Sequence, residues 1–348
     1  MAYTTIDKPS DYFNTVLYTG NSSTQAIAVG FQSDWVWCKP RTNTGSHFLT
    51  DSVRGGTKVI ISNTTGAEIT RSSNIQSFTS TGYTLGADGT SNFNGDATVA
   101  WNWKAGTSFT NDASGTGIGS IDSAGSVNND AGFSICSYTG TGSNGTVKHG
   151  LSTTPSTIIY KRRNSTSGWV VWHKSIGTNI LELNETGAAQ GGSSYINGTV
   201  PTSSVFSIGT SGDINADGGT YVAYCFNDVQ GYSKFGSYTG NGTDNNGTFV
   251  YTGFKPAWLM VKRTDSTSDW SMYDIKREAA NPQYEFDLQL EANDNAAEGS
   301  DGQLGMYSNG FKLRSSDAFL NASGGTYIYM AFAEQPFVTS TGVPATAR

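Results

Sequence analysis

Charged residues are scarce in this sequence: Asp, Glu, Lys and Arg make up 14% of its 348 residues, against roughly a quarter in an average globular protein. The net charge is −7 and the basic residues form no stripe, which argues against sequence-independent binding to nucleic acid or anionic lipid. No apolar run approaches the ~20 residues of a membrane helix, so we expect no membrane insertion. Residues 1–10 lack the features of a secretory signal, and we therefore expect a chain that is not secreted.

Cysteine and histidine are also few. Three cysteines lie singly within apolar runs and only three histidines are present, so a disulfide framework or a zinc site is not indicated. No nucleophile elbow, P-loop or twelve-residue calcium loop occurs. Asp51 and Asp274 occupy equivalent places in two repeats, but His173 takes that place in a third. A position that changes its chemistry in this way is typical of a structural role, so we predict no catalytic residues, no metal and no cofactor.

Small polar residues and aromatic residues are abundant instead. Gly, Ser, Thr and Asn account for 154 positions, and the chain has 17 Tyr, 17 Phe and 8 Trp. Coiled coils and long amphipathic helices need Ala, Leu, Glu and Lys in bulk, so this composition excludes them. Aromatic side chains fit the pleated surface of a sheet, and Gly and Asn favour turns. The composition therefore predicts an all-β protein with many turns.

A threefold tandem repeat organises the chain. The sequence Tyr-Thr-Gly begins at Tyr18, Tyr138 and Tyr238, and an apolar strand follows each copy. We predict that these strands, Trp35 to Lys39, Ile158 to Lys161 and Trp258 to Lys262, are equivalent. A pair of residues spaced by four comes next in each copy: His47 and Asp51, Trp169 and His173, Trp270 and Asp274. The repeat unit is about 85–95 residues long.

The strand pattern favours β-sandwiches of the jelly-roll or lectin-like kind. In residues 221–226 both alternating sets of side chains are apolar, which is expected of a strand that is covered on both faces. Each copy ends in two strands, such as 82–86 and 98–103, which we predict to pair as a hairpin. A β-propeller is the competing repeat architecture, but the two halves of each unit do not resemble each other.

The repeats divide the chain into six parts. We predict an N-terminal arm at 1–11 and a C-terminal extension at 338–348. Between them lie sandwich repeats at 12–104, 132–233 and 234–337, and a Gly-, Ser- and Asn-rich linker at 105–131 joins the first two.

Three tryptophans suggest a binding site. Trp169, Trp172 and Trp270 lie beside turns rich in Asn, Asp, Ser and Thr. An aromatic ring next to amides and carboxylates can stack on a sugar while the polar groups bind its hydroxyls. The alternative is that these rings simply cover the edge of a sandwich. We include the neighbouring His173 and Asp274 in the predicted ligand site.

The repeat resembles a known sequence pattern. Residues 238–274, the segment Ser308 to Arg314 and the segment Asn321 to Ile328 resemble a repeat that is abundant in structural proteins of marine bacteriophages. The resemblance covers residues 12–337. It implies concanavalin-like or jelly-roll sandwiches and a tail or fibre component of the virion, and it brings no catalytic or binding residues with it.

Together these observations predict a non-enzymatic virion protein, assembled in the bacterial host cytoplasm, that acts as a tail fibre or receptor-binding appendage. We expect a homotrimer, since appendages are symmetric oligomers, with other virion proteins and bacterial surface polysaccharide as partners. Two alternatives remain at this stage: a head-decoration or tail-collar protein without host contact, and a polysaccharide depolymerase.

Overall fold

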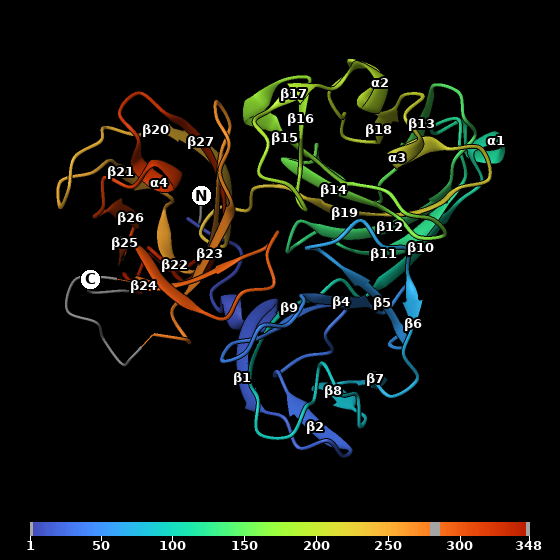
Figure 1. Ribbon diagram of the computed structural model, residues 1–348. Coiled ribbons are helices and arrows are strands. Elements are labelled where there is room, and N and C mark those ends of the chain that lie inside the picture. Colours follow the sequence, from blue (N-terminus) through green and yellow to red (C-terminus); the bar gives the residue numbers. More distant parts are fainter. Residues whose placement is uncertain (1–2, 279–285, 346–348) are drawn as a thin grey trace.

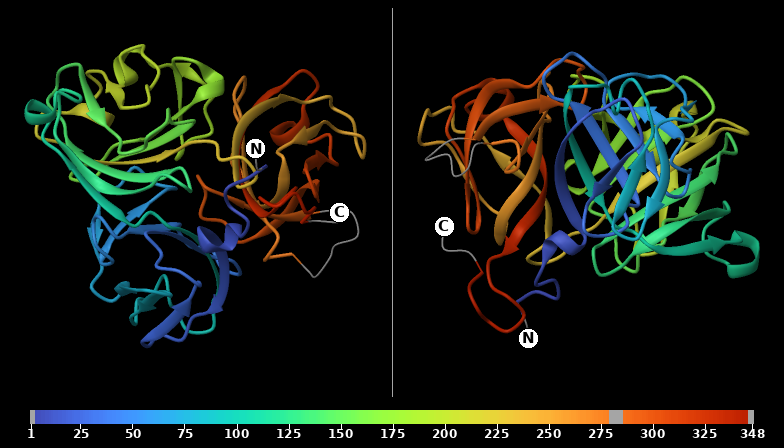
Figure 2. Two further views of the ribbon diagram at one scale, coloured as in Figure 1. Left: turned by 180° about the vertical axis from the view of Figure 1, so that it is seen from behind. Right: turned by 90° about the horizontal axis from the view of Figure 1, so that it is seen from below.

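The computed structural model describes residues 3–278 and 286–345 and is all-β, as predicted. Three sandwich units follow one another along the chain and lie around a common centre (Figure 1). A view from behind and a view from below show the same three bodies side by side (Figure 2). We refer to them as the first, second and third unit.

The first unit follows a one-turn helix, η1 (Pro9–Asp11). Its large sheet has the strand order β1-β9-β3-β4-β5-β6 and its small sheet the order β2-β8-β7. The strands are β1 (Phe13–Thr19), β2 (Gln25–Ala28), β3 (Trp35–Pro40), β4 (Phe48–Asp51), β5 (Lys58–Ile61), β6 (Ile69–Thr70), β7 (Ile75–Thr79), β8 (Gly82–Leu85) and β9 (Ala97–Trp103).

The second unit repeats this plan with short helices in its connections. Its large sheet has the order β10-β11-β12-β19-β14-β15-β16-β17, and β13 pairs with β18. The elements are β10 (Thr107–Asn111), α1 (Ala113–Thr116), β11 (Ser123–Asn128), β12 (Phe133–Thr139), β13 (Gly145–Lys148), β14 (Thr157–Arg162), β15 (Trp169–His173), η2 (Lys174–Ile176), β16 (Asn179–Glu182), β17 (Gln190–Gly191), α2 (Ser193–Ile196), β18 (Val205–Ile208), α3 (Gly212–Asn215) and β19 (Thr220–Phe226).

In the third unit the two sheets are continuous, with the order β20-β27-β22-β23-β24-β25-β26-β21. The elements are β20 (Ser233–Thr239), β21 (Phe249–Tyr251), β22 (Phe254–Arg263), β23 (Trp270–Asp274), β24 (Phe286–Glu291), β25 (Gly299–Tyr307), β26 (Gly310–Leu313), α4 (Ala318–Asn321) and β27 (Thr326–Pro336).

The strand register confirms the predicted repeat. In each unit the strand predicted to be equivalent (β3, β14 or β22) lies between the last strand of the unit (β9, β19 or β27) and the strand at the pair of residues spaced by four (β4, β15 or β23). Trp35 pairs with Trp103 and Asp51, and Trp258 pairs with Phe332 and Asp274. The second unit has the same pairs with Thr157 opposite Phe226 and His173. Because pairing partners match position by position, equivalent residues can be assigned across the units.

Two expectations differ from the structure. The two strands that end each copy do not form a hairpin: β8 pairs with β2 and β7, whereas β9 pairs with β1 and β3. Both arms are apolar because each covers a sandwich core, and the sequence pattern alone does not reveal that they lie in different sheets. The stretch 105–131, predicted as a linker, carries β10 and β11, and β11 pairs with β12 along the edge of the second unit's large sheet.

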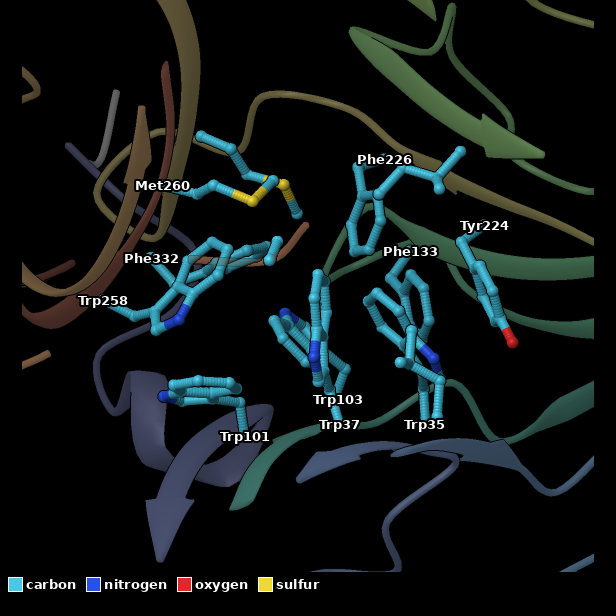
Figure 3. Packing of buried hydrophobic residues seen from close by; sticks show 14 of the residues in the cluster. Trp35, Trp37, Trp101, Trp103, Phe133, Tyr224, Phe226, Trp258, Met260 and Phe332 are labelled. Atoms are coloured by element: carbon cyan, nitrogen blue, oxygen red, sulfur yellow. The ribbon is translucent and has the colours of Figure 1, made fainter. Parts of the chain in front are cut away.

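The apolar faces of each large sheet have different neighbours. One face covers the unit's own small sheet; in the second unit Tyr221, Ala223 and Cys225 lie there. The other face carries Val222, Tyr224 and Phe226 and points to the centre of the molecule. The central side chains of the three units form one cluster, which we name the common core (Figure 3). It includes Trp35, Trp37, Trp101, Trp103, Phe133, Tyr224, Phe226, Trp258, Met260 and Phe332.

Candidate functional site

The structure buries all of the predicted ligand-site residues. No more than 2% of any of them is exposed: Trp169, Trp172, His173, Trp270 and Asp274. A ring without an exposed face cannot stack on a sugar, so the three tryptophans do not form the predicted binding platform. The turns beside them are polar, but a neighbouring unit or the unit's own small sheet covers the rings.

Trp169 and Trp270 instead join the units to one another. The indole Nε1 of Trp169 donates to the carbonyl oxygen of Ile61 at 2.9 Å, and that of Trp270 donates to the carbonyl oxygen of Glu182 at 3.0 Å. These carbonyls belong to the last residues of β5 and β16. Each tryptophan therefore bonds the carbonyl group at the end of the equivalent strand in the preceding unit.

The third interface, between the third and first units, closes this cycle. His47, the counterpart of both tryptophans, places its Nε2 2.8 Å from the carbonyl oxygen of Glu291, the last residue of β24. Its Nδ1 accepts a hydrogen bond from Trp37, which leaves Nε2 as the donor. The three contacts are cyclically equivalent, so the repeat extends from the fold of each unit to the way the units pack.

Two of the interfaces contain a buried ion pair that sequence reasoning missed. Asp51 bonds Arg54 within the first unit at 2.5 Å and accepts the Tyr224 hydroxyl of the second at 2.7 Å. Asp274 bonds Arg277 within the third unit at 2.6 Å and accepts Trp101 Nε1 of the first at 3.0 Å. Each carboxylate therefore accepts hydrogen bonds from the arginine of its own unit and from one side chain of a neighbouring unit.

A glutamate extends each of these networks to a second arginine. Glu68 bonds Arg54 of its own unit and Arg163 of the second unit, at 3.0 and 2.9 Å. At the interface between the third and first units, Glu298 bonds Arg277 and Arg41, at 2.9 and 2.7 Å. The recurrence of Asp-x-x-Arg at Asp51 and at Asp274 is the sequence signal that could have revealed these pairs.

The interface between the second and third units uses uncharged residues at the same positions. His173 replaces the aspartate, Ile176 the arginine, and Met330 the aromatic donor. His173 and Met330 line one small cavity of about 10 Å³ at this interface. Ala189 replaces the glutamate of the other two networks, and Thr264 replaces its second arginine. The backbone N–H of Ala189 still donates to the carbonyl oxygen of Thr264 at 2.9 Å, as Glu68 does to Arg163 and Glu298 to Arg41. The backbone contact is therefore common to the three interfaces, while the buried Asp–Arg pair is present at only two.

His173 gives this interface a pH dependence. Burial and, as a smaller cause, the charge of Lys174 together lower the pKa of His173 to about 3. As the pH falls from 6.5 the unfolded chain binds a proton that the folded chain does not, so stability falls with the pH. The expected loss between pH 7 and pH 5 is about 2 kcal/mol. His47 and His149 are buried with lowered pKa values as well and contribute to the loss in both proteins. Urea unfolding at both pH values should therefore show a loss that is about 2 kcal/mol larger in the wild type than in His173→Asn; equal losses would contradict the assignment.

Three equivalent lysines lie buried at the same interfaces. Burial lowers the pKa of Lys39, Lys161 and Lys262 to about 8. Lys161 donates to the carbonyl oxygen of Thr65 of the first unit, and Lys262 donates to that of Thr186 of the second. The ammonium groups of Lys161 and Lys262 therefore bind backbone carbonyls of the preceding unit, whereas that of Lys39 donates to the carbonyl oxygen of Pro40 in its own unit.

The interfaces are suited to assembly of the three units. The buried carboxylates of Asp51 and Asp274 accept hydrogen bonds from both of the units that meet at their interface. Among the described residues no cluster of three or more His, Cys, Asp or Glu side chains could hold a metal ion. Of the helices in 3–278 and 286–345, none has the length and apolar character that a membrane crossing requires.

Comparison with protein families places most of the chain in one family model. A model described as a domain of unknown function (DUF7483) matches residues 8–336. The chain belongs to this family. The match spans all three units, so the family is defined by the complete three-unit body and not by a single sandwich. No curated protein matches the chain.

Proposed function

We propose that the protein is a non-enzymatic structural protein of a bacteriophage particle, a tail fibre or receptor-binding appendage that contacts glycans of the host surface. The observation that carries this proposal is the cyclic equivalence of the three interfaces. Asp51, Asp274 and His47, which are side chains of the kind that enzymes use for chemistry, form hydrogen bonds between units in this protein. The resemblance of the repeat to virion proteins agrees with such a role.

The three units reproduce the symmetry of a trimer within one chain. Their large sheets bury a common core that separate sandwiches would need partners to cover. A homotrimer of this three-unit body stays a prediction, as do its contacts with other virion proteins. A head-decoration or collar protein would use the same body without contacting the host, and a depolymerase would in addition cut the glycan.

Locating the chain in a particle tests the proposal. Mass spectrometry of purified particles should detect the protein, and an electron-microscopy map should place it at the tail. Light scattering of the purified chain should give three times its 36.9 kDa mass. A position on the head would favour decoration, and release of reducing ends from host polysaccharide would favour the depolymerase.

A further inference from the structure

Strands β21, β26 and β25 of the third unit correspond to the small sheet β2-β8-β7 of the first unit, and two of them, β21 and β25, expose aromatic rings. Phe249 and Tyr251 of β21 are 45% and 56% exposed, and Tyr307 of β25 is half-buried beside them. The rings of Phe249 and Tyr307 have centroids 6.3 Å apart and are inclined at 63°. These strands lie on the side of the third unit that faces away from the other two (Figure 1). The rings therefore form an angled aromatic surface open to solvent.

The other two units provide an internal comparison for these positions. Val250 pairs with Phe311 as Ile27 pairs with Tyr83, so Phe249 and Tyr251 correspond to Ala26 and Ala28 of the first unit. The same register assigns their counterparts in the second unit to residues 146 and 148, a threonine and a lysine. The sandwich therefore folds without aromatic rings at these positions, and the rings of the third unit are additions to the common plan.

Glycines beneath the rings make them lie along the sheet. A Cβ atom on Gly310 would come within 3.1 Å of Phe249 Cζ, and one on Gly305 within 2.7 Å of Tyr307 Cε2. The Phe249 ring thus covers the backbone of Gly310 on the neighbouring strand β26, and the Tyr307 ring covers that of Gly305 on its own strand β25. A ring in this position turns its other face toward solvent, where a pyranose can stack on it.

Two cations flank the rings. Lys312 lies opposite Phe249 in the strand register, and its Nζ donates to Asn246 Oδ1 at 3.0 Å. Arg314 donates to the Tyr307 hydroxyl, and to the carbonyl oxygen of Asn245 at 3.1 Å. The first and second units have Thr84 and Ser207 in place of Lys312, and Gly86 and Gly209 in place of Arg314.

Arg314 also lines a surface cavity of about 300 Å³ next to the rings, together with Gln303. The cavity carries the carboxylates of Asp244 and Asp317 as well: Asp244 accepts a hydrogen bond from the Ser316 backbone at 2.7 Å, and Asp317 accepts one from the Ser315 hydroxyl. The cations lie beside the rings, and the two carboxylates lie at the cavity.

We propose that this face, formed by Phe249, Tyr251, Tyr307, Lys312 and Arg314, binds an acidic polysaccharide. The aromatic faces stack on sugar rings, and the two cations pair with the carboxylates of uronic acid units. A single-stranded nucleic acid would use similar groups and carries the same sign of charge, so the host-glycan role proposed above decides for the polysaccharide, and oligo(dT) is an arm of the test. The inference deepens the proposed function and rests on it, since it names the surface and the class of host glycan.

Binding of the full chain to polygalacturonate and to alginate, with dextran as a neutral control, tests the inference. We expect the acidic polymers to bind and dextran not to bind. The variants Phe249→Ala and Tyr307→Ala should each lose affinity at least tenfold, and Lys312→Gln should lose affinity and part of its salt dependence. Phe93→Ala removes a ring of the first unit that is 52% exposed and should bind as the wild type does. Thermal unfolding controls for the folding of each variant.

Three results would overturn the inference. Equal binding of folded Phe249→Ala, Tyr307→Ala and wild type would place the glycan elsewhere. Failure of both acidic polymers to bind would exclude the ligand class, and tighter binding of oligo(dT) would assign the face to nucleic acid. The proposed virion role is judged separately, by the location of the chain in the particle, so the two failures are distinguishable.

Discussion

Trp35→Ala is expected to destabilise the whole chain by about 4 kcal/mol, within the range of Trp-to-Ala changes in protein cores. Trp35 is completely buried in the common core. Its ring stacks on Tyr224 of the second unit at 4.3 Å and packs against Trp103 of the first at 4.5 Å. The variant therefore leaves a cavity that two units share, and neither can close it without moving against the other.

Calorimetry measures this effect together with its cooperativity. Because the three units share the common core, we expect the wild type to unfold in one transition, with equal calorimetric and van't Hoff enthalpies. Trp35→Ala should lower the temperature of that single transition. Phe93→Ala is the control, since an exposed ring should change stability by no more than about 0.5 kcal/mol. Separate transitions, of which Trp35→Ala shifts only one, would contradict a shared core.

Local patterns predicted the sandwich units well, because strand alternation and turn residues are properties of neighbouring positions. Residues 221–226 are apolar on both faces, and the structure covers both faces. The pairing of distant strands was harder: β8 and β9 follow each other in sequence yet lie in different sheets. Nothing in a short apolar segment specifies which of two sheets it joins.

The candidate site was mispredicted for a related reason. Polar turns beside Trp169 and Trp270 suggested exposure, but the surface that covers each ring belongs to a unit about 100 residues away in sequence. The exposed rings did leave a signal. Phe249 and Tyr251 flank a core residue in a strand where the first unit has Ala26 and Ala28, so a comparison of outward-facing positions among the copies would have singled them out.

Arg277→Met is expected to cost about 3–5 kcal/mol, since it leaves the Asp274 carboxylate buried without its ionic partner. Both side chains are completely buried, and Trp101 Nε1 and backbone amides would remain as the donors to Asp274. The exposed ion pair of Lys8 with Asp11 is the control, because Lys8→Met should change stability by less than about 1 kcal/mol. Urea unfolding at pH 7 compares the two.

The interface between the second and third units indicates how the loss can be repaired. It has His173, Ile176 and Met330 where the interface between the third and first units has Asp274, Arg277 and Trp101. The double variant Asp274→His, Arg277→Ile removes both buried charges together and keeps Trp101, whose ring is part of the common core, and Glu298 keeps its bond to Arg41. Replacing a buried ion pair by uncharged groups is often neutral, so the double variant should be more stable than Arg277→Met alone. If it is less stable, the three interfaces are equivalent in backbone geometry and not in the side chains that they accept.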